Sequence, residues 1–121
     1  IPGSSAYFQG GIVPYHNEIK INTLGVRKET IEQYGAVSEQ CAAEMANMAR
    51  EKFGADIGAS STGVAGPDGG TPEKPVGTVW IAYADGEQTI TKRLQLTKNR
   101  RLNIELTQIA VLNLVRKSLN A

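Results

Sequence analysis

The chain has 121 residues, of which 40% are hydrophobic and 21% charged, and its formal net charge is +1. This length suits one domain with a single core, and the composition is that of a soluble globular protein. The near-neutral charge argues against nucleic acid or a membrane surface as the main partner. No apolar run approaches the roughly 20 residues that a membrane-spanning helix needs.

The first half of the chain predicts one strand and three helices. Residues 8–15 are expected to form a strand that ends at a proline. Short helical pieces are expected over residues 17–24 and 28–34, each followed by a glycine that stops it. Ser38 is expected to cap a longer helix that ends before Gly54. The core face of this helix is predicted from apolar residues spaced three and four apart: Cys41, Met45, Met48, Ala49 and Phe53.

The second half predicts three strands and a final helix. Residues 57–61 and 78–84 lack a clean alternation of apolar and polar side chains, which is typical of strands buried on both faces. Residues 88–96 alternate, which favours a hairpin partner nearer the edge of the sheet. The last helix is expected to run from Thr97 or Asn99 to about Leu119. The predicted fold is α/β, a three-layer α/β/α sandwich with a mixed, mostly parallel sheet.

Neither disulfide nor metal chemistry is expected. Cys41 is the single cysteine, so it forms no internal disulfide, and its place on an apolar helix face favours a buried structural thiol over a nucleophile. His16 is the single histidine and has no cluster of metal-binding residue types around it in the sequence.

A stiff loop is predicted between the two apolar strands. Residues 63–77 include five glycines and three prolines, so regular secondary structure cannot pass through this segment. Glycine allows the backbone to approach a ligand closely, and proline reduces the freedom that binding would remove. A ligand-binding loop is therefore favoured, with an ordinary surface connection as the alternative.

Tyr15 and Lys20 lie where the first strand is expected to give way to a helix. A bend between them would bring the phenol and the amine together, and burial of a lysine favours the neutral amine that can act as a general base. From the residues alone, a solvated lysine remains an open alternative.

Several segments, in order along the chain, resemble one known family. They are residues 3–8, 11–20, 24–26, 35–39, 62–70 and 74–77, and the most specific is Thr62-Gly-Val-Ala-Gly-Pro-Asp-Gly-Gly. Together they resemble the CinA C-terminal domain family, the nicotinamide-nucleotide amidohydrolases.

The resemblance implies hydrolysis of the carboxamide of nicotinamide mononucleotide (NMN) to nicotinic acid mononucleotide and ammonia, without a metal or redox cofactor. By this resemblance Tyr15 and Lys20 transfer protons, and Arg100 holds the phosphate. A solvated surface arginine is the alternative for Arg100. The remaining substrate-binding positions that it implies are Ser5, Thr62, Gly63 and Gly66.

In this family the serine nucleophile lies in a Glu-Ser-x-Thr-Gly-Gly-like segment upstream of the position of Gly3. The chain starts at Ile1 and has no such segment. We therefore expect residues 1–121 to be one domain truncated at its N-terminus, with an incomplete sheet and no activity of its own. The resemblance also implies a cytoplasmic homo-oligomer. The alternatives are a non-catalytic nucleotide-binding module of a competence- or damage-inducible protein, and a purely structural partner domain.

Overall fold

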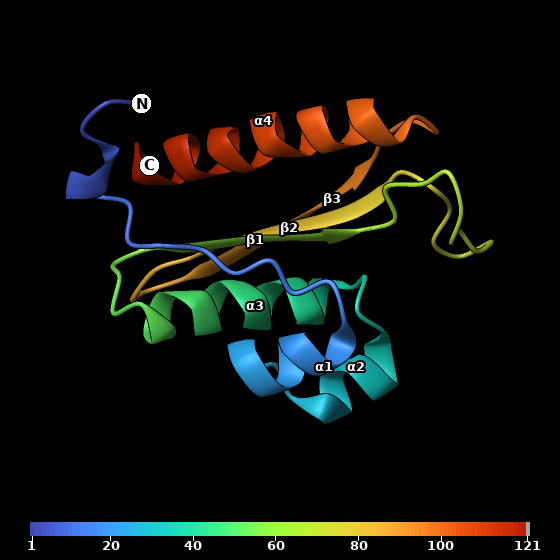
Figure 1. Ribbon diagram of the computed structural model, residues 1–121, viewed down its shortest axis with the longest axis horizontal. Coiled ribbons are helices and arrows are strands. Elements are labelled where there is room, and N and C mark those ends of the chain that lie inside the picture. The colour runs from blue at the N-terminus through green and yellow to red at the C-terminus, as the bar shows by residue number, and fades with distance from the viewer. Residues whose placement is uncertain (121) are drawn as a thin grey trace.

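A three-stranded antiparallel sheet forms the middle of the computed structural model, which describes residues 1–120. Its strands are β1 (Gly58–Gly63), β2 (Thr78–Ala84) and β3 (Thr89–Gln95), and β2 is central. Helix α3 (Glu39–Lys52) covers one face of the sheet, and α4 (Arg100–Leu119) lies along the other (Figure 1). The chain therefore has an α/β fold with helices on both sides of the sheet.

The expectation of a mostly parallel sheet is wrong for the described strands. β1 pairs with β2 from Gly58 opposite Ala84 to Gly63 opposite Val79, and β3 is also antiparallel to β2. Both connections return directly without a helix, whereas parallel neighbours need a crossover. The apolar residues of β2 indicate only that both faces of the strand are covered. A central antiparallel strand between two helices is covered on both faces just as a parallel strand is.

β1 also differs from expectation, because it is buried on one face only. Its residues alternate between buried and exposed. Ser60 and Thr62 are buried on the α3 side, where the Ser60 hydroxyl donates to the Ala42 carbonyl at 2.6 Å. Ala59 and Ser61 are exposed, because α4 lies mainly over β2.

The segment over residues 8–15 is not a strand. It runs as an irregular chain, and in the described part of the protein it pairs with no strand. It is held instead by packing: Ile12 packs against the core cluster of Leu24, Val26, Cys41 and Met45.

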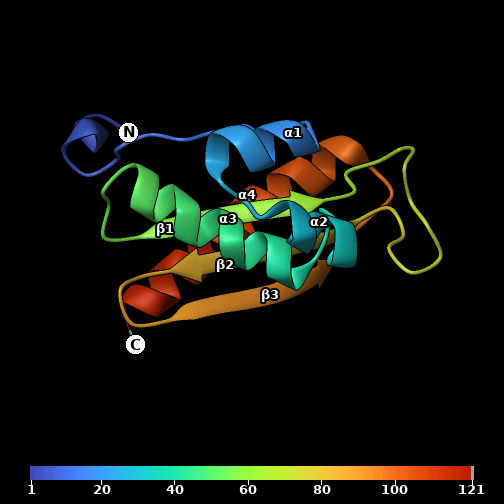
Figure 2. The same cartoon turned by 90° about the horizontal axis from the view of Figure 1, so that it is seen from below.

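The helices follow the local signals in the sequence. A short 3-10 turn, η1 (Ser4–Ala6), precedes α1 (Asn17–Ile19), which continues into the π-helical turn η2 (Lys20–Leu24) and ends at Gly25. α2 (Lys28–Tyr34) ends at Gly35. Figure 2 shows α1 and α2 on the same side of the sheet as α3.

Side-chain caps define the starts of the two long helices. The Ser38 hydroxyl accepts a hydrogen bond from the Cys41 N–H at 3.1 Å, and the side-chain Oδ1 of Asn99 accepts one from the Leu102 N–H at 2.9 Å. Within residues 1–120, no helix combines the length and the apolar character needed to cross a membrane.

Candidate functional site

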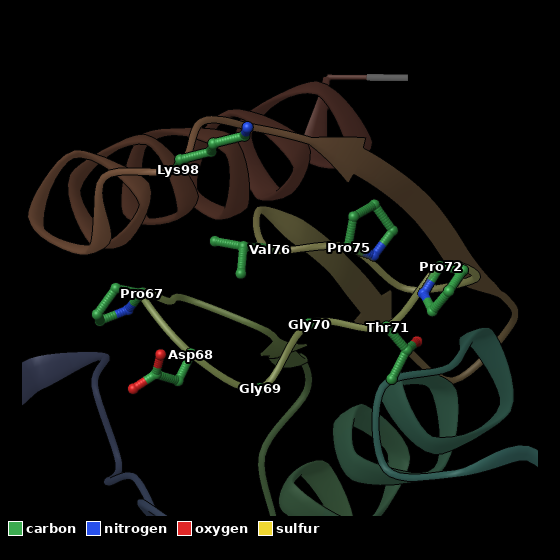
Figure 3. Close-up of a pocket in the computed structure, with 9 residues that line it drawn as sticks. All are labelled: Pro67, Asp68, Gly69, Gly70, Thr71, Pro72, Pro75, Val76 and Lys98. Carbon is green, nitrogen blue, oxygen red and sulfur yellow. The ribbon is translucent and has the colours of Figure 1, made fainter.

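A pocket of about 560 Å³ lies within the loop that joins β1 to β2. Its lining consists of residues 67–72, Pro75 and Val76 from the loop, and Lys98 from the turn between β3 and α4 (Figure 3). The loop therefore forms nearly the whole wall. Lys98 supplies a positive charge and Asp68 a negative one, on opposite sides of the loop (Figure 3).

The shape of this loop depends on a close approach between Gly66 and the side chain of Val76. Gly66 has φ 90°, and a Cβ there would lie 2.6 Å from Cγ1 of Val76. The two ends of the loop therefore pack against each other at a position where only glycine fits.

The middle of the loop is held by a short turn and by one long side chain. The Thr71 hydroxyl accepts from the Lys74 N–H at 3.0 Å, and the Thr71 N–H donates to the Lys74 carbonyl at 3.0 Å. The Lys74 ammonium donates to the Tyr34 carbonyl at 2.8 Å, at the C-terminus of α2 where the helix dipole favours a cation.

The base of the loop continues the hydrogen bonding of the sheet. The Val64 N–H donates to the Thr78 carbonyl at 2.9 Å, and the Gly77 N–H donates to the Val64 carbonyl at 2.7 Å. The Leu96 N–H then donates to the Gly77 carbonyl at 2.7 Å, which connects the loop to the end of β3. Both ends of the loop are thus fixed at one place.

The first turn of α4 completes this attachment. Nη1 of Arg100 donates to the Gly66 carbonyl at 3.0 Å, so two predicted site residues are in direct contact. Asn103, which is 1% exposed, donates to the Ala65 carbonyl at 3.0 Å. The sequence analysis did not identify Asn103 as a site residue. The available signal was a polar residue on the same helix face as the half-buried Leu106 and Ala110.

Lys20 and Tyr15 lie close together in the chain but in different surroundings. The Lys20 side chain is buried, and its Nζ donates to the Pro14 carbonyl at 2.7 Å. Tyr15 directly follows that carbonyl and is 78% exposed. Neither residue lines the pocket within the loop.

Cys41 is fully buried, and burial raises the pKa of its thiol from 9.0 to about 11. The positive charge of Lys20 opposes this rise in pKa, Glu44 adds to it, and Lys74 opposes it. The thiol is therefore protonated at neutral pH and packs as an apolar group, as its sequence position predicts.

The remaining predicted site residues lie at two ends of the sheet. Thr62 and Gly63 end β1 and lead into the loop, and the Thr62 hydroxyl donates to the Ala36 carbonyl at 2.8 Å. Ser5 belongs to the dark-blue start of the chain, which lies at the other end of the sheet from the loop (Figures 1 and 2). The structure thus brings Gly66 and Arg100 together, with Thr62 and Gly63 adjoining, and does not bring Ser5 to them.

The family model described as the CinA C-terminal domain matches residues 1–119. The chain is 54% identical over 119 residues to a CinA-like protein of Cytophaga hutchinsonii, covering 98% of this chain and 28% of that protein. It is 56% identical over 119 residues to a CinA-like protein of Amoebophilus asiaticus, with coverage of 98% and 29%. The chain therefore spans less than a third of the length of these curated relatives.

Solved structures of competence/damage-inducible proteins are also similar to this chain. The competence/damage inducible protein CihA of Agrobacterium tumefaciens superposes with a TM-score of 0.95 at 36% identity, covering 100% of this chain and 74% of that one. The competence damage-inducible protein A of Klebsiella pneumoniae superposes with a TM-score of 0.94 at 34% identity, with coverage of 99% and 74%.

Proposed function

Because the chain belongs to the CinA C-terminal domain family, we propose that its whole protein hydrolyses the carboxamide of NMN. The products are nicotinic acid mononucleotide and ammonia, and the reaction recycles pyridine nucleotides. The observation that carries the proposal is the rigid glycine- and proline-rich loop, with Lys98 on its pocket and Arg100 bound to its backbone. This combination provides a preformed wall and cationic groups for a phosphorylated ligand.

The phosphate is proposed to bind at the start of α4. Arg100 uses one guanidinium N–H for the Gly66 carbonyl, and a guanidinium has five N–H donors in total. The free donors suit a phosphate, and the positive end of the α4 dipole adds to the attraction. Lys98, which lines the pocket, carries a further positive charge.

Lys20 is proposed as the general base, with Tyr15 beside it as a proton relay. A serine Oγ attacks the carboxamide carbon and gives its proton to Lys20 acting as the base. The tetrahedral intermediate then breaks its C–N bond, and Lys20 returns the proton to the leaving ammonia. Water repeats the sequence on the acyl-enzyme and releases nicotinic acid mononucleotide. The family resemblance places this serine in a segment upstream of Gly3.

Backbone N–H groups near Thr62 and Gly63 are proposed to stabilise the oxyanion. The Val64 N–H donates to Thr78 of β2, so the alternation of an antiparallel ladder directs the Gly63 N–H away from β2. A donor that is already oriented costs no reorganisation when negative charge develops on the carbonyl oxygen. Ser5 keeps its proposed place in substrate binding from the resemblance alone. The same resemblance supports a cytoplasmic homo-oligomer.

The test is ammonia release from NMN by the whole protein, with the 121-residue chain and nicotinamide as comparisons. We expect release by the whole protein and none by this chain, which lacks the serine segment. Arg100→Ala should raise the KM for NMN about tenfold or more and have little effect with nicotinamide, which has no phosphate. Arg101→Ala is the matched control, because its neighbouring side chain is exposed and forms an ion pair with Glu105 at 3.6 Å. No ammonia release by the whole protein would exclude the deamidase and favour a nucleotide-binding module.

A further inference from the structure

Asn103 is the buried centre of the contacts that attach the pocket loop to the rest of the protein. Its Nδ2 donates to the Ala65 carbonyl at 3.0 Å and to the Thr97 carbonyl at 2.8 Å. Its Oδ1 accepts from the Thr97 N–H at 2.8 Å and from the Thr97 hydroxyl at 2.6 Å. All four hydrogen-bonding positions of the amide are therefore occupied.

The chemistry of these partners fixes the orientation of the amide. A backbone N–H can only donate and a carbonyl can only accept, so Oδ1 must face the Thr97 N–H and Nδ2 must face the two carbonyls. A residue with a different donor and acceptor arrangement would leave buried polar groups unpaired, which is costly away from water.

Asn103 acts together with Arg100, one helical turn earlier. Asn103 holds the Ala65 carbonyl and Arg100 holds the Gly66 carbonyl, so two consecutive peptide groups of the loop are attached to α4. The contact between Gly66 and Val76 extends this attachment to the other end of the loop.

The same network also positions the cation that lines the pocket. Lys98 lies between Thr97 and Asn99, and the Asn99 N–H donates to the Thr97 hydroxyl at 3.0 Å. That hydroxyl is the group that donates to Oδ1 of Asn103. On one side of Lys98 the Thr97 N–H is thus bonded to the Asn103 amide, and on the other side the Asn99 N–H is bonded to the Thr97 hydroxyl.

We propose that Asn103 is a positioning residue for the ligand pocket. Its side-chain amide sets the distance between the loop wall and the start of α4, where Lys98 and Arg100 lie. Asn103 does not line the pocket and acts through the loop and the turn that it holds. The proposal rests on the proposed function for the identity of the ligand.

The test substitutes Asn103→Asp in the whole protein. Aspartate keeps an acceptor for Thr97 but places a carboxylate oxygen against the carbonyls of Ala65 and Thr97. The matched control is Asn113→Asp on the same helix, where the side chain is exposed and its Oδ1 accepts from Arg116. Two quantities are measured. The first is hydrogen exchange of the amides over residues 64–77, which include the hydrogen-bonded N–H groups of Val64 and Gly77. The second is the KM and kcat for NMN.

We expect Asn103→Asp to increase exchange in the loop at least about tenfold, while the amides of β2 keep their protection. KM should rise about tenfold and kcat should change by less than about threefold, because Lys20 is untouched. The control should resemble the wild type. If Asn103→Asp does not fold, Thr97→Val replaces it. This variant removes one of the four hydrogen bonds of Asn103 and also the bond from the Asn99 N–H to the Thr97 hydroxyl. We expect about a threefold rise in KM with faster loop exchange.

Unchanged exchange in the loop would overturn the proposal, because Asn103 would then not hold the wall. Faster exchange with a wild-type KM would also overturn it, because the wall would then not depend on its attachment to bind ligand. If the wild-type protein does not act on NMN, the proposed function fails by itself. The exchange measurement then still decides whether Asn103 positions the loop.

Discussion

Lys20 combines burial with a short hydrogen bond from its Nζ to the Pro14 carbonyl. A carbonyl accepts from either the ammonium or the neutral amine, so this contact fixes the position of Nζ without requiring a charge. The residue after that carbonyl is Tyr15, so the proposed base and relay are connected through one peptide group. The hydrogen bond holds the Lys20 amine at a defined place, as the proposed general base requires.

We expect Lys20→Ala in the whole protein to lower the turnover of NMN by about a hundredfold or more, the usual scale for loss of general acid–base help. The matched control is Lys28→Ala, which removes an exposed lysine whose ammonium lies 3.8 Å from Glu32. Steady-state ammonia release measures both variants, and circular dichroism checks that they fold. Wild-type turnover in Lys20→Ala would remove the proposed base.

Burial that depends on neighbouring residues in the chain could be predicted from the sequence. Roles that depend on contacts with residues far away in the chain could not. Cys41 is buried with a raised thiol pKa, as its helix face indicates. The catalytic roles of Tyr15 and Lys20 stay predictions. Asn103 was not identified, because its importance depends on Ala65, 38 positions away in the chain.

At the scale of elements, helix ends were predictable because they depend on neighbouring residues. Ser38 and Asn99 cap α3 and α4, and Gly25 and Gly35 stop the two preceding helical segments. The strand expected over residues 8–15 was wrong, because a strand also needs a partner, and local composition does not provide one.

Two glycines of the pocket loop allow the effect of a steric contact to be distinguished from the effect of backbone strain. Gly66 and Gly69 have similar positive φ angles of 90° and 93°. A Cβ at Gly66 would lie 2.6 Å from Val76, but a Cβ at Gly69 would lie 3.7 Å from its nearest neighbour, Val64. Alanine at either position therefore strains the backbone, whereas only alanine at Gly66 pushes the two ends of the loop apart.

We expect Gly69→Ala to lower the free energy of unfolding by about 1 kcal/mol. Gly66→Ala should cost about 1–3 kcal/mol more, because Val76 must move. Only Gly66→Ala should weaken NMN binding, by about tenfold, because it alone displaces the pocket wall. Urea unfolding and calorimetric titration measure these effects. Equal effects of the two substitutions would show that the Gly66–Val76 contact does not shape the pocket.

At the scale of the whole molecule, the α/β class and the helices on both faces of the sheet could be predicted from the order of the elements. The direction of the strands could not. The apolar sequence of β2 indicates that both of its faces are covered, but the same side chains would suit a parallel or an antiparallel neighbouring strand. Direction was decided by the connections, since the loop over residues 64–77 and the turn over residues 85–88 both lead straight back.

The core around Cys41 predicts how global stability depends on pH. The folded state raises the thiol pKa from 9.0 to about 11, so between these values the unfolded chain loses a proton that the folded chain retains. This contribution to stability is complete below pH 9 and is lost as the pH rises towards 11. The free energy of unfolding of the wild type should therefore fall more steeply over this range than that of Cys41→Ala. Urea unfolding at several pH values tests this, and parallel curves would contradict it.

Both ends of the pocket loop are attached at one place, and this separates the part of the loop that the fold holds from the part that can vary. Val64, Ala65, Gly66 and Gly77 are bound to the sheet or to α4, whereas residues 67–73 are exposed. Changes in the length or composition of this exposed tip would alter the pocket without disturbing any strand pairing. The fold thus allows this tip to vary at little cost to folding, because its exposed residues do not build the core.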